Sequence, residues 1–146
     1  HNYFYKVESR LPLSRNSNIH SYNNYFDQCK NCASIRKNTY LFNEANYYNG
    51  CSNPFGIDSS VVKSYGDIFM DSSKGSAVIA TSRNQVVSNS CKPDSKTNYS
   101  KFDTDPTLFY YDAENGISDV DYLLSAEDVP EFVTKYAGAG IMVRLP

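Results

Sequence analysis

Apolar and polar residues alternate in short stretches along this chain, and few stretches are long enough to predict an element. Residues 2–8 are rich in aromatic side chains and alternate weakly, which predicts a strand. In residues 57–70 the apolar side chains recur at helical spacing, and Asp58, Ser59 and Ser60 stand before them as potential N-caps. This pattern predicts the clearest helix of the chain.

Further along, the pattern predicts several shorter elements. Residues 76–81 form an apolar run that predicts a buried strand, and residues 107–113 predict a second strong strand. A polar stretch with two prolines, residues 92–106, is typical of a surface loop. A short helix is expected over 83–90, a short mixed segment over 117–124 and a final strand over 139–145.

Residues 125–138 are compatible with two structures. Asp128 and Glu131 have the spacing of a capping box, and Pro130 is tolerated in the first turn of a helix that would end at Tyr136. Alternatively, the same residues form a loop that leads into a strand over 132–137. Helix propensity slightly favours the first structure.

Residues 13–56 are the least regular part of the sequence. They are rich in Asn, Ser and Tyr and contain turn signals at Asn49-Gly50 and at residues 54–56. No internal repeat is apparent. Because so long a segment without predicted structure needs support, we expect disulfides to hold it in place.

Four cysteines give this expectation a chemical basis, and an even number is typical of a secreted protein with two disulfides. They are Cys29, Cys32, Cys51 and Cys91. Three pairings are possible, and a bridge between Cys29 and Cys32 is the least expected because its loop would be strained. A zinc site on the same two residues is the alternative, but a structural zinc ion needs two further ligands at matching spacing.

Length and composition predict one soluble domain over residues 1–146, built mainly of strands and loops. The formal net charge is -2, which argues against non-specific nucleic-acid binding, and no apolar run approaches the length of a membrane span. The chain begins with His1 instead of Met, as expected after removal of a signal peptide, and Asn98 stands in a glycosylation sequon. Together with the cysteines, these features predict a secreted protein.

Four short motifs occur in an order that resembles a known enzyme family. They are Tyr5-Lys6-Val7-Glu8-Ser9-Arg10-Leu11-Pro12, Ala80-Thr81-Ser82, Ser118-Asp119-Val120, and Glu131 before Gly138-Ala139-Gly140-Ile141. This order is similar to that of the catalytic subunits of the cholera, heat-labile enterotoxin and pertussis group of ADP-ribosyltransferases, fungal relatives included.

The resemblance implies an α+β fold, an ADP-ribosyltransferase-like split β-sandwich with a few short helices. It also implies NAD+ as a substrate, without a metal. It implies that Arg10 binds the phosphates or ribose of NAD+, that Thr81 and Ser82 support the ribose edge, and that Glu131 is the catalytic carboxylate. A host protein would be the target, and a partner subunit is compatible with the family.

Two other functions stay open at this stage. The first is the same fold with a degenerate active site, acting as a secreted effector. The second is an unrelated disulfide-stabilised domain, such as an adhesin, an inhibitor or another binding module. Glu131 would separate these functions, because catalysis requires its carboxylate to lie near the Thr81 and Ser82 hydroxyls and across a cleft from Arg10.

Overall fold

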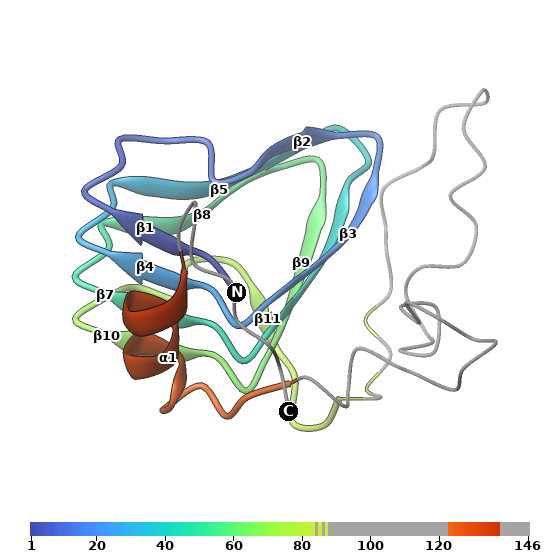
Figure 1. The fold of residues 1–146 in the computed structure, drawn as a ribbon. Coiled ribbons are helices and arrows are strands. Elements are labelled where there is room, and N and C mark those ends of the chain that lie inside the picture. Colours follow the sequence, from blue (N-terminus) through green and yellow to red (C-terminus); the bar gives the residue numbers. More distant parts are fainter. Residues whose placement is uncertain (84, 86, 88–122, 138–146) are drawn as a thin grey trace, which may run out of the picture.

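Short strands wind into a coil of three parallel sheets in the computed structural model, which describes residues 1–83, 85, 87 and 123–137. Each turn of the chain contributes one strand to each of three sheets, so that the described residues form a parallel β-helix of about three turns with one short helix (Figure 1). Every strand pair is parallel, and each strand therefore lies on its equivalent from the preceding turn.

We name the sheets A, B and C in the order in which the chain first enters them. Sheet A consists of β1 (Tyr3–Tyr5), β4 (Tyr25–Asp27), β7 (Tyr47–Asn49) and β10 (Ile68–Met70). Sheet B consists of β2 (Leu13–Arg15), β5 (Asn31–Arg36) and β8 (Asn53–Asp58). Sheet C consists of β3 (Asn18–Tyr22), β6 (Tyr40–Glu44), β9 (Val61–Tyr65) and β11 (Val78–Ile79).

The length of one turn is visible in sheet A. Tyr3 pairs with Tyr25, Tyr25 with Tyr47, and Tyr47 with Ile68, so a turn takes 22, 22 and then 21 residues. Since parallel strands lie about 4.8 Å apart, each residue stacks directly on its counterpart from the preceding turn.

Stacked aromatic rings fill the interior beneath sheet A. The centroid of Phe4 lies 5.0 Å from that of Phe26, Phe26 lies 4.7 Å from Tyr48, and Tyr48 lies 5.0 Å from Phe69. Phe26 and Tyr48 are almost fully buried. The ring spacing equals the strand spacing, so apolar burial and the backbone ladder favour the same register.

Corners between the sheets require backbone conformations that few residues adopt. Each turn passes through the left-handed region at the corner from sheet C to sheet A, where Asn23, Ala45 and Gly66 have φ of 49°, 50° and 68°. The corner after sheet A behaves in the same way at Lys6, Gln28, Gly50 and Asp71. Asn and Gly tolerate this region best, and Asn23, Gly50 and Gly66 occupy three of these seven positions.

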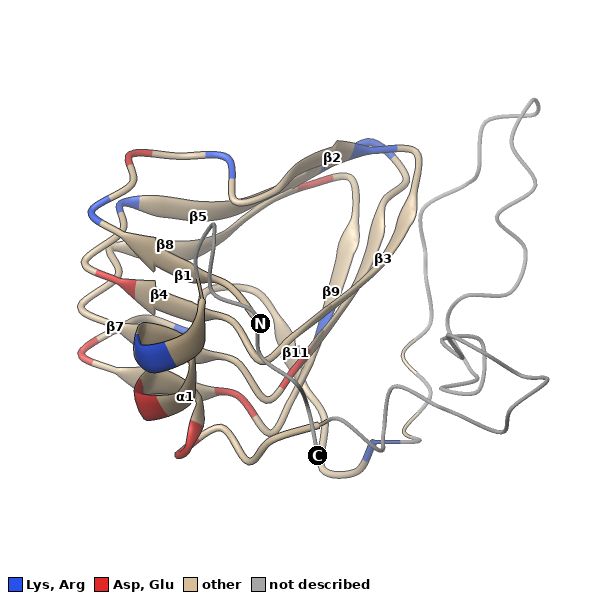
Figure 2. Ribbon diagram, in the orientation of Figure 1, with Lys and Arg blue, Asp and Glu red and all other residues tan. Residues whose placement is uncertain are grey.

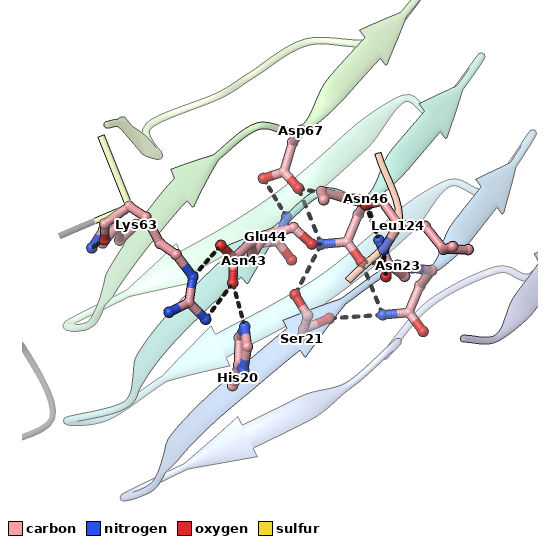
Figure 3. Close-up of polar contacts among 12 residues, drawn as sticks. His20, Ser21, Asn23, Asn43, Glu44, Asn46, Lys63, Asp67 and Leu124 are labelled. Atoms are coloured by element: carbon pink, nitrogen blue, oxygen red, sulfur yellow. Dashed lines mark hydrogen bonds and ion pairs between the residues drawn. The ribbon is translucent and has the colours of Figure 1, made fainter. Parts of the chain in front are cut away.

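Side-chain amides join the turns next to the corner from sheet C to sheet A. The Nδ2 of Asn2 donates to Oδ1 of Asn24 (2.8 Å), Asn24 Nδ2 donates to Oδ1 of Asn46 (2.9 Å), and Asn46 Nδ2 donates to Oδ1 of Asp67 (3.1 Å). We call this row the amide ladder. Asn46 is fully buried and also donates to the carbonyl of Ser21, and Figure 3 shows Asn46 between Ser21 and Asp67.

Helix α1 (Val129–Tyr136) packs against β1 and β4, with Val129 and Val133 buried. Asn23 fixes the segment that leads into this helix, because its side chain donates to the carbonyl of Leu124 (2.9 Å) and accepts from its amide (2.8 Å). The helix has eight residues, and none of the described helices could span a membrane.

Comparison with the sequence-based expectations gives a mixed result. The helix over 128–136 is confirmed, although Asp128 makes no side-chain capping bond. The helix over 57–70 is wrong: these residues form the end of β8, then β9 and β10. Their apolar spacing arises because strands of three to six residues alternate with corners, which imitates a helical period.

The predicted α+β split β-sandwich is also wrong, because the strands form a mainly-β parallel coil. Residues 13–56 are regular throughout and contain the strands from β2 to most of β8. The strand over 76–81 is reduced to β11, which is exposed and not buried. The strands predicted over 107–113 and 139–145 and the loop over 92–106 lie outside the described residues, as do nearly all of 117–124 and much of 83–90.

We predict that Asn46→Ala lowers the free energy of unfolding by about 3 kcal/mol, because several buried groups lose their hydrogen-bond partner at once. Urea unfolding followed by circular dichroism measures this change. Asn31→Ala is the matched control, since Asn31 is exposed and accepts one bond of 3.3 Å from Asn53. Equal stability losses in the two variants would contradict a role for the amide ladder in holding the turns.

Candidate functional site

The outer face of sheet B carries a polar groove of about 450 Å³. Strand alternation builds it, because Ala33 and Ile35 of β5 point into the core while Ser34 and Arg36 point outward. Its lining is almost entirely polar and consists of Ser9, Arg10, Asn31, Ser34, Arg36, Asn53, Gly56, Ile57 and Asp58. We call this surface the sheet B groove.

Charged side chains of consecutive turns meet at one end of this face. Arg15 of β2 pairs in register with Arg36 of β5, and Arg36 pairs with Asp58 of β8. Figure 2 shows Lys and Arg gathered at β2 and the adjoining corner, with an acidic position on the neighbouring strand. Arg15 and Arg36 repel each other, and the single carboxylate of Asp58 offsets only part of their charge, so this row favours an anion.

Arg10 reaches the same groove from the turn before β2. Its backbone adopts φ of 71°, and its amide donates to the carbonyl of Asn31 (3.1 Å), which docks the turn on β5. Within the described residues, neither Arg10 nor Arg36 forms an ion pair, and both are exposed. The groove therefore offers two guanidinium groups to a ligand.

A second group of charged residues lies on the outer face of sheet C (Figure 3). The carboxylate of Glu44 accepts three hydrogen bonds, from Nε2 of His20 (2.9 Å) and from Nε (2.6 Å) and Nη2 (3.1 Å) of Arg83. Burial opposes the charge on Glu44, but the hydrogen bonds from His20 and Arg83 outweigh burial and lower the pKa of Glu44. This carboxylate is fully buried, and both of its oxygens accept hydrogen bonds.

Lys63 completes this second group. Its ammonium lies 4.5 Å from the ring centroid of Phe42 and donates to the carbonyl of Arg83. Burial lowers the pKa of Lys63. All these contacts attach the segment around Arg83 to sheet C, so we assign the group a structural role and take the sheet B groove as the candidate site.

Asp67 is a second carboxylate in Figure 3, half-buried and one turn beyond Asn46. It accepts hydrogen bonds from the amide of Asn46 (2.7 Å), from Nδ2 of Asn43 (2.7 Å) and from the hydroxyl of Ser64. Burial nevertheless dominates and raises the pKa of Asp67 to about 6. The two carboxylates therefore have pKa values displaced in opposite directions.

The residues that the sequence predicted as one site lie in three different parts of the structure. Arg10 lines the sheet B groove, whereas Thr81 follows β11 and donates through its hydroxyl to Oε1 of Gln85 (3.1 Å). Ser82 is exposed in the same turn. Glu131 lies on α1 and lines a different small hollow beside Phe132 and Lys135.

Three of the four cysteines are described, and all three are buried free thiols: Cys29, Cys32 and Cys51. Cys91 lies outside the described residues, as does the sequon at Asn98. The predicted bridges are thus not formed among the described cysteines. Residues 13–56 are ordered without disulfides among the described cysteines because backbone hydrogen bonds between paired strands already join the turns.

Comparison with known proteins identifies a family. The sequence matches the family model described as pectate lyase over residues 1–142, which is nearly the whole chain. No curated protein and no solved structure matches it significantly. A parallel β-helix is the fold that this family predicts.

This match overturns the resemblance to ADP-ribosyltransferases, and with it the toxin and virulence function and the use of NAD+ as a substrate. The order of the four motifs was a coincidence of short, common sequences. The roles assigned to Thr81, Ser82 and Glu131 depended on NAD+ and have no basis without it. Arg10 remains a candidate site residue, for a different ligand.

Sequence reasoning missed Arg36 and Asp58, the charged residues of the groove. Both were unremarkable in the linear sequence, since Arg36 lay in the segment judged irregular and Asp58 was taken for a helix cap. A repeat of 22 residues would have placed Arg36 beside Asp58 on one face. That repeat was the signal available.

We predict that Asp67 makes folding less favourable as the pH rises. Its pKa in the folded state is about 6 and its ordinary value is 3.8, so the folded state binds more protons between these values. The contribution of the neutral carboxyl is complete below pH 3.8 and is lost as the pH rises to about 6, at a cost of up to about 3 kcal/mol.

Urea unfolding at pH 4 and pH 7 tests this prediction. Asp67→Asn should remove the loss of stability between the two pH values, whereas the exposed Asp71→Asn control should keep it. The readout is the difference between pH values within each variant, so a uniform destabilisation by Asp67→Asn does not affect it. An unchanged pH profile in Asp67→Asn would show that this carboxyl is ionised throughout.

Proposed function

The chain belongs to the pectate lyase family, and we propose that it binds a uronate-containing polysaccharide along the sheet B groove and cleaves it by β-elimination. The observation that carries this proposal is the pair of exposed guanidinium groups, Arg10 and Arg36, on a polar concave face without ion-pair partners in the described part of the chain. Pectate carries a carboxylate on each sugar, which supplies the missing anion.

Guanidinium groups suit this ligand for a geometric reason. The planar fork of arginine donates two parallel hydrogen bonds to one carboxylate, which fixes the orientation of the sugar as well as its charge. A carboxylate bound at Arg36 also offsets the repulsion between Arg15 and Arg36, which are stacked in register. The amides of Asn31 and Asn53 provide neutral donors and acceptors for sugar hydroxyls.

β-Elimination needs a base that removes the proton from the carbon next to the uronate carboxylate. The electron pair then forms a carbon–carbon double bond while the bond to the glycosidic oxygen breaks, and that oxygen takes up a proton. Among the described residues that line the groove, Asp58 is the one carboxylate. We assign the base to Asp58, whose Oδ1 accepts a hydrogen bond of 3.1 Å from the Ser59 hydroxyl.

Pectate lyases typically use Ca2+. A calcium site in a protein takes six to eight oxygen ligands, usually with several carboxylates. The groove has a single carboxylate, and no group of three or more acidic, Cys or His side chains in the described residues could hold a metal ion. The described residues therefore do not fit this ion, and we route no step through it.

Export from the cell is part of this proposal, since enzymes of this family are generally secreted. The polysaccharide itself is too large to enter most cells, and a single domain over residues 1–146 is consistent with one groove. We propose no nucleic-acid partner, because the groove collects anions through two arginines and not through an extended basic surface.

Arg36→Ala is expected to weaken the binding of polygalacturonate oligomers roughly tenfold, as loss of a charged hydrogen-bonding group usually does. Isothermal titration in the presence of a chelator measures the contribution of the guanidinium group alone. Lys74→Ala is the matched control, because Lys74 is an exposed cation that does not line the groove. Equal affinities of Arg36→Ala and the parent protein would move the binding surface elsewhere.

Asp58→Asn is expected to reduce the rate of cleavage at least a hundredfold while affinity changes only a few fold, because the amide keeps the shape but cannot accept the proton. Ultraviolet absorbance of the unsaturated product follows the reaction. Asp71→Asn is the matched control, because it changes an exposed carboxylate that does not line the groove. This variant should cleave the polysaccharide at the same rate as the parent protein. Full activity in Asp58→Asn would assign the base to another residue.

A further inference from the structure

The first turn of the coil contains one residue more, beside sheet B, than the turn that follows it. Ser9 lies opposite Asn31 and Leu13 lies opposite Ser34, so three residues of the first turn face two of the second. Strands β5 and β8 of the next two turns match one to one. The extra residue is a β-bulge, a feature that is frequent at sheet edges and beside active sites, where it redirects a side chain.

Arg10 is the extra residue of this bulge. It has φ of 71°, whereas no residue of β5 or β8 has a positive φ. The amides of Arg10 and Leu11 donate to successive carbonyls of the second turn, those of Asn31 (3.1 Å) and Cys32 (2.8 Å). A regular parallel ladder directs only every second amide at the same neighbour. Pro12 follows, and it has no N–H with which to continue the ladder.

The bulge turns a charged side chain outward where the later turns have buried side chains. Cys32 and Pro54, the residues in the corresponding place of the second and third turns, are both buried. In the first turn Leu11 takes this inward place and packs against the main apolar cluster. Arg10 is instead exposed and lines the sheet B groove. Without the extra residue, position 10 would face the core, where an unpaired guanidinium group is very unfavourable.

Arg10 and Arg36 lie at opposite ends of the sheet B groove. The amide of Arg10 bonds to Asn31, the first residue of β5, whereas Arg36 is the last residue of that strand. At about 3.3 Å per residue, the two ends of β5 are about 16 Å apart. Figure 2 shows Lys and Arg positions near the start of β5 and again at β2. Asp58, to which we assign the base, pairs with Arg36 and is therefore distant from Arg10.

We propose that the bulge makes Arg10 a remote subsite of the sheet B groove, which binds a second uronate of the same polysaccharide chain and selects oligomers over single sugars. This inference rests on the proposed binding of uronates. Once one carboxylate of a chain is bound at Arg36, binding of the next at Arg10 is intramolecular and strengthens the complex. A single uronate has one carboxylate and can occupy only one of the two sites.

Arg10→Gly tests the guanidinium group without disturbing the bulge, because glycine adopts φ of 71° without strain. Isothermal titration measures the binding of galacturonate and of its hexamer in the Asp58→Asn background, in which cleavage should be suppressed. Lys30→Ala is the matched control. Lys30 is an exposed cation at the same end of the sheet, pairs with Glu8 (3.0 Å) and does not line the groove.

We expect Arg10→Gly to weaken binding of the hexamer about tenfold and to leave the affinity for the monomer unchanged, because only the hexamer reaches both sites. The melting temperature should equal or exceed that of the parent protein, since the left-handed backbone is relieved. With Asp58 intact, the same substitution should raise KM for polygalacturonate and leave kcat unchanged, because the contact is the same in the ground state and the transition state. Lys30→Ala should change none of these values.

Three results would overturn the remote subsite. The first is hexamer binding that is unchanged in Arg10→Gly although Arg36→Ala weakens it, which would leave the proposed function intact. The second is an equal loss of affinity for monomer and hexamer, which would place both arginines in one site. The third is a melting temperature several degrees below that of the parent, which would make Arg10 a structural residue. A parent protein that binds no hexamer would instead overturn the proposed function, and this inference with it.

Discussion

Parallel pairing of each turn with the next is the constraint on which the rest of this molecule depends. Tyr3, Tyr25 and Tyr47 lie in one line because their strands share one register, and every other position follows them. A shift of one residue would turn the aromatic stack of Phe4, Phe26 and Tyr48 toward solvent. Burial and the backbone ladder therefore select the same arrangement, and neither can change alone.

Stacking of like on like has different consequences inside and outside the coil. In the core, identical side chains on consecutive turns attract each other, because aromatic rings stack and each side-chain amide can both donate and accept a hydrogen bond. On the surface, equal charges repel, and the stack of Arg15 on Arg36 carries positive charge that Asp58, the other register neighbour of Arg36, offsets only in part. Glu44 shows the opposite solution, in which His20 and Arg83 neutralise a buried carboxylate. This contrast explains why the outer face of sheet B suits an anionic ligand, whereas the outer face of sheet C holds the segment around Arg83.

The sequence contained enough information for the fold, but in a form that local periodicity does not detect. Asn2-Tyr3-Phe4, Asn24-Tyr25-Phe26 and Asn46-Tyr47-Tyr48 recur at intervals of 22 residues, and a search for repeats would have found them. Helix α1 was predictable because helix propensity and a proline in the first turn are local signals, although the capping bond expected of Asp128 is not formed. Residues 57–70 were not, because corners after every few residues imitate a helical spacing. The groove could not be predicted without the register, since Arg36 and Asp58 become neighbours only when β5 lies against β8.

The backbone ladder also explains why the coil is ordered while its described cysteines are free thiols. Asn31 precedes Cys32 on β5, and its register partner Asn53 follows Cys51 by two residues, so the floor of the groove and these thiols lie in the same two turns. Parallel pairing already aligns these turns, so their order does not depend on a disulfide among the described cysteines. The stacked strands themselves therefore fix the geometry of the groove.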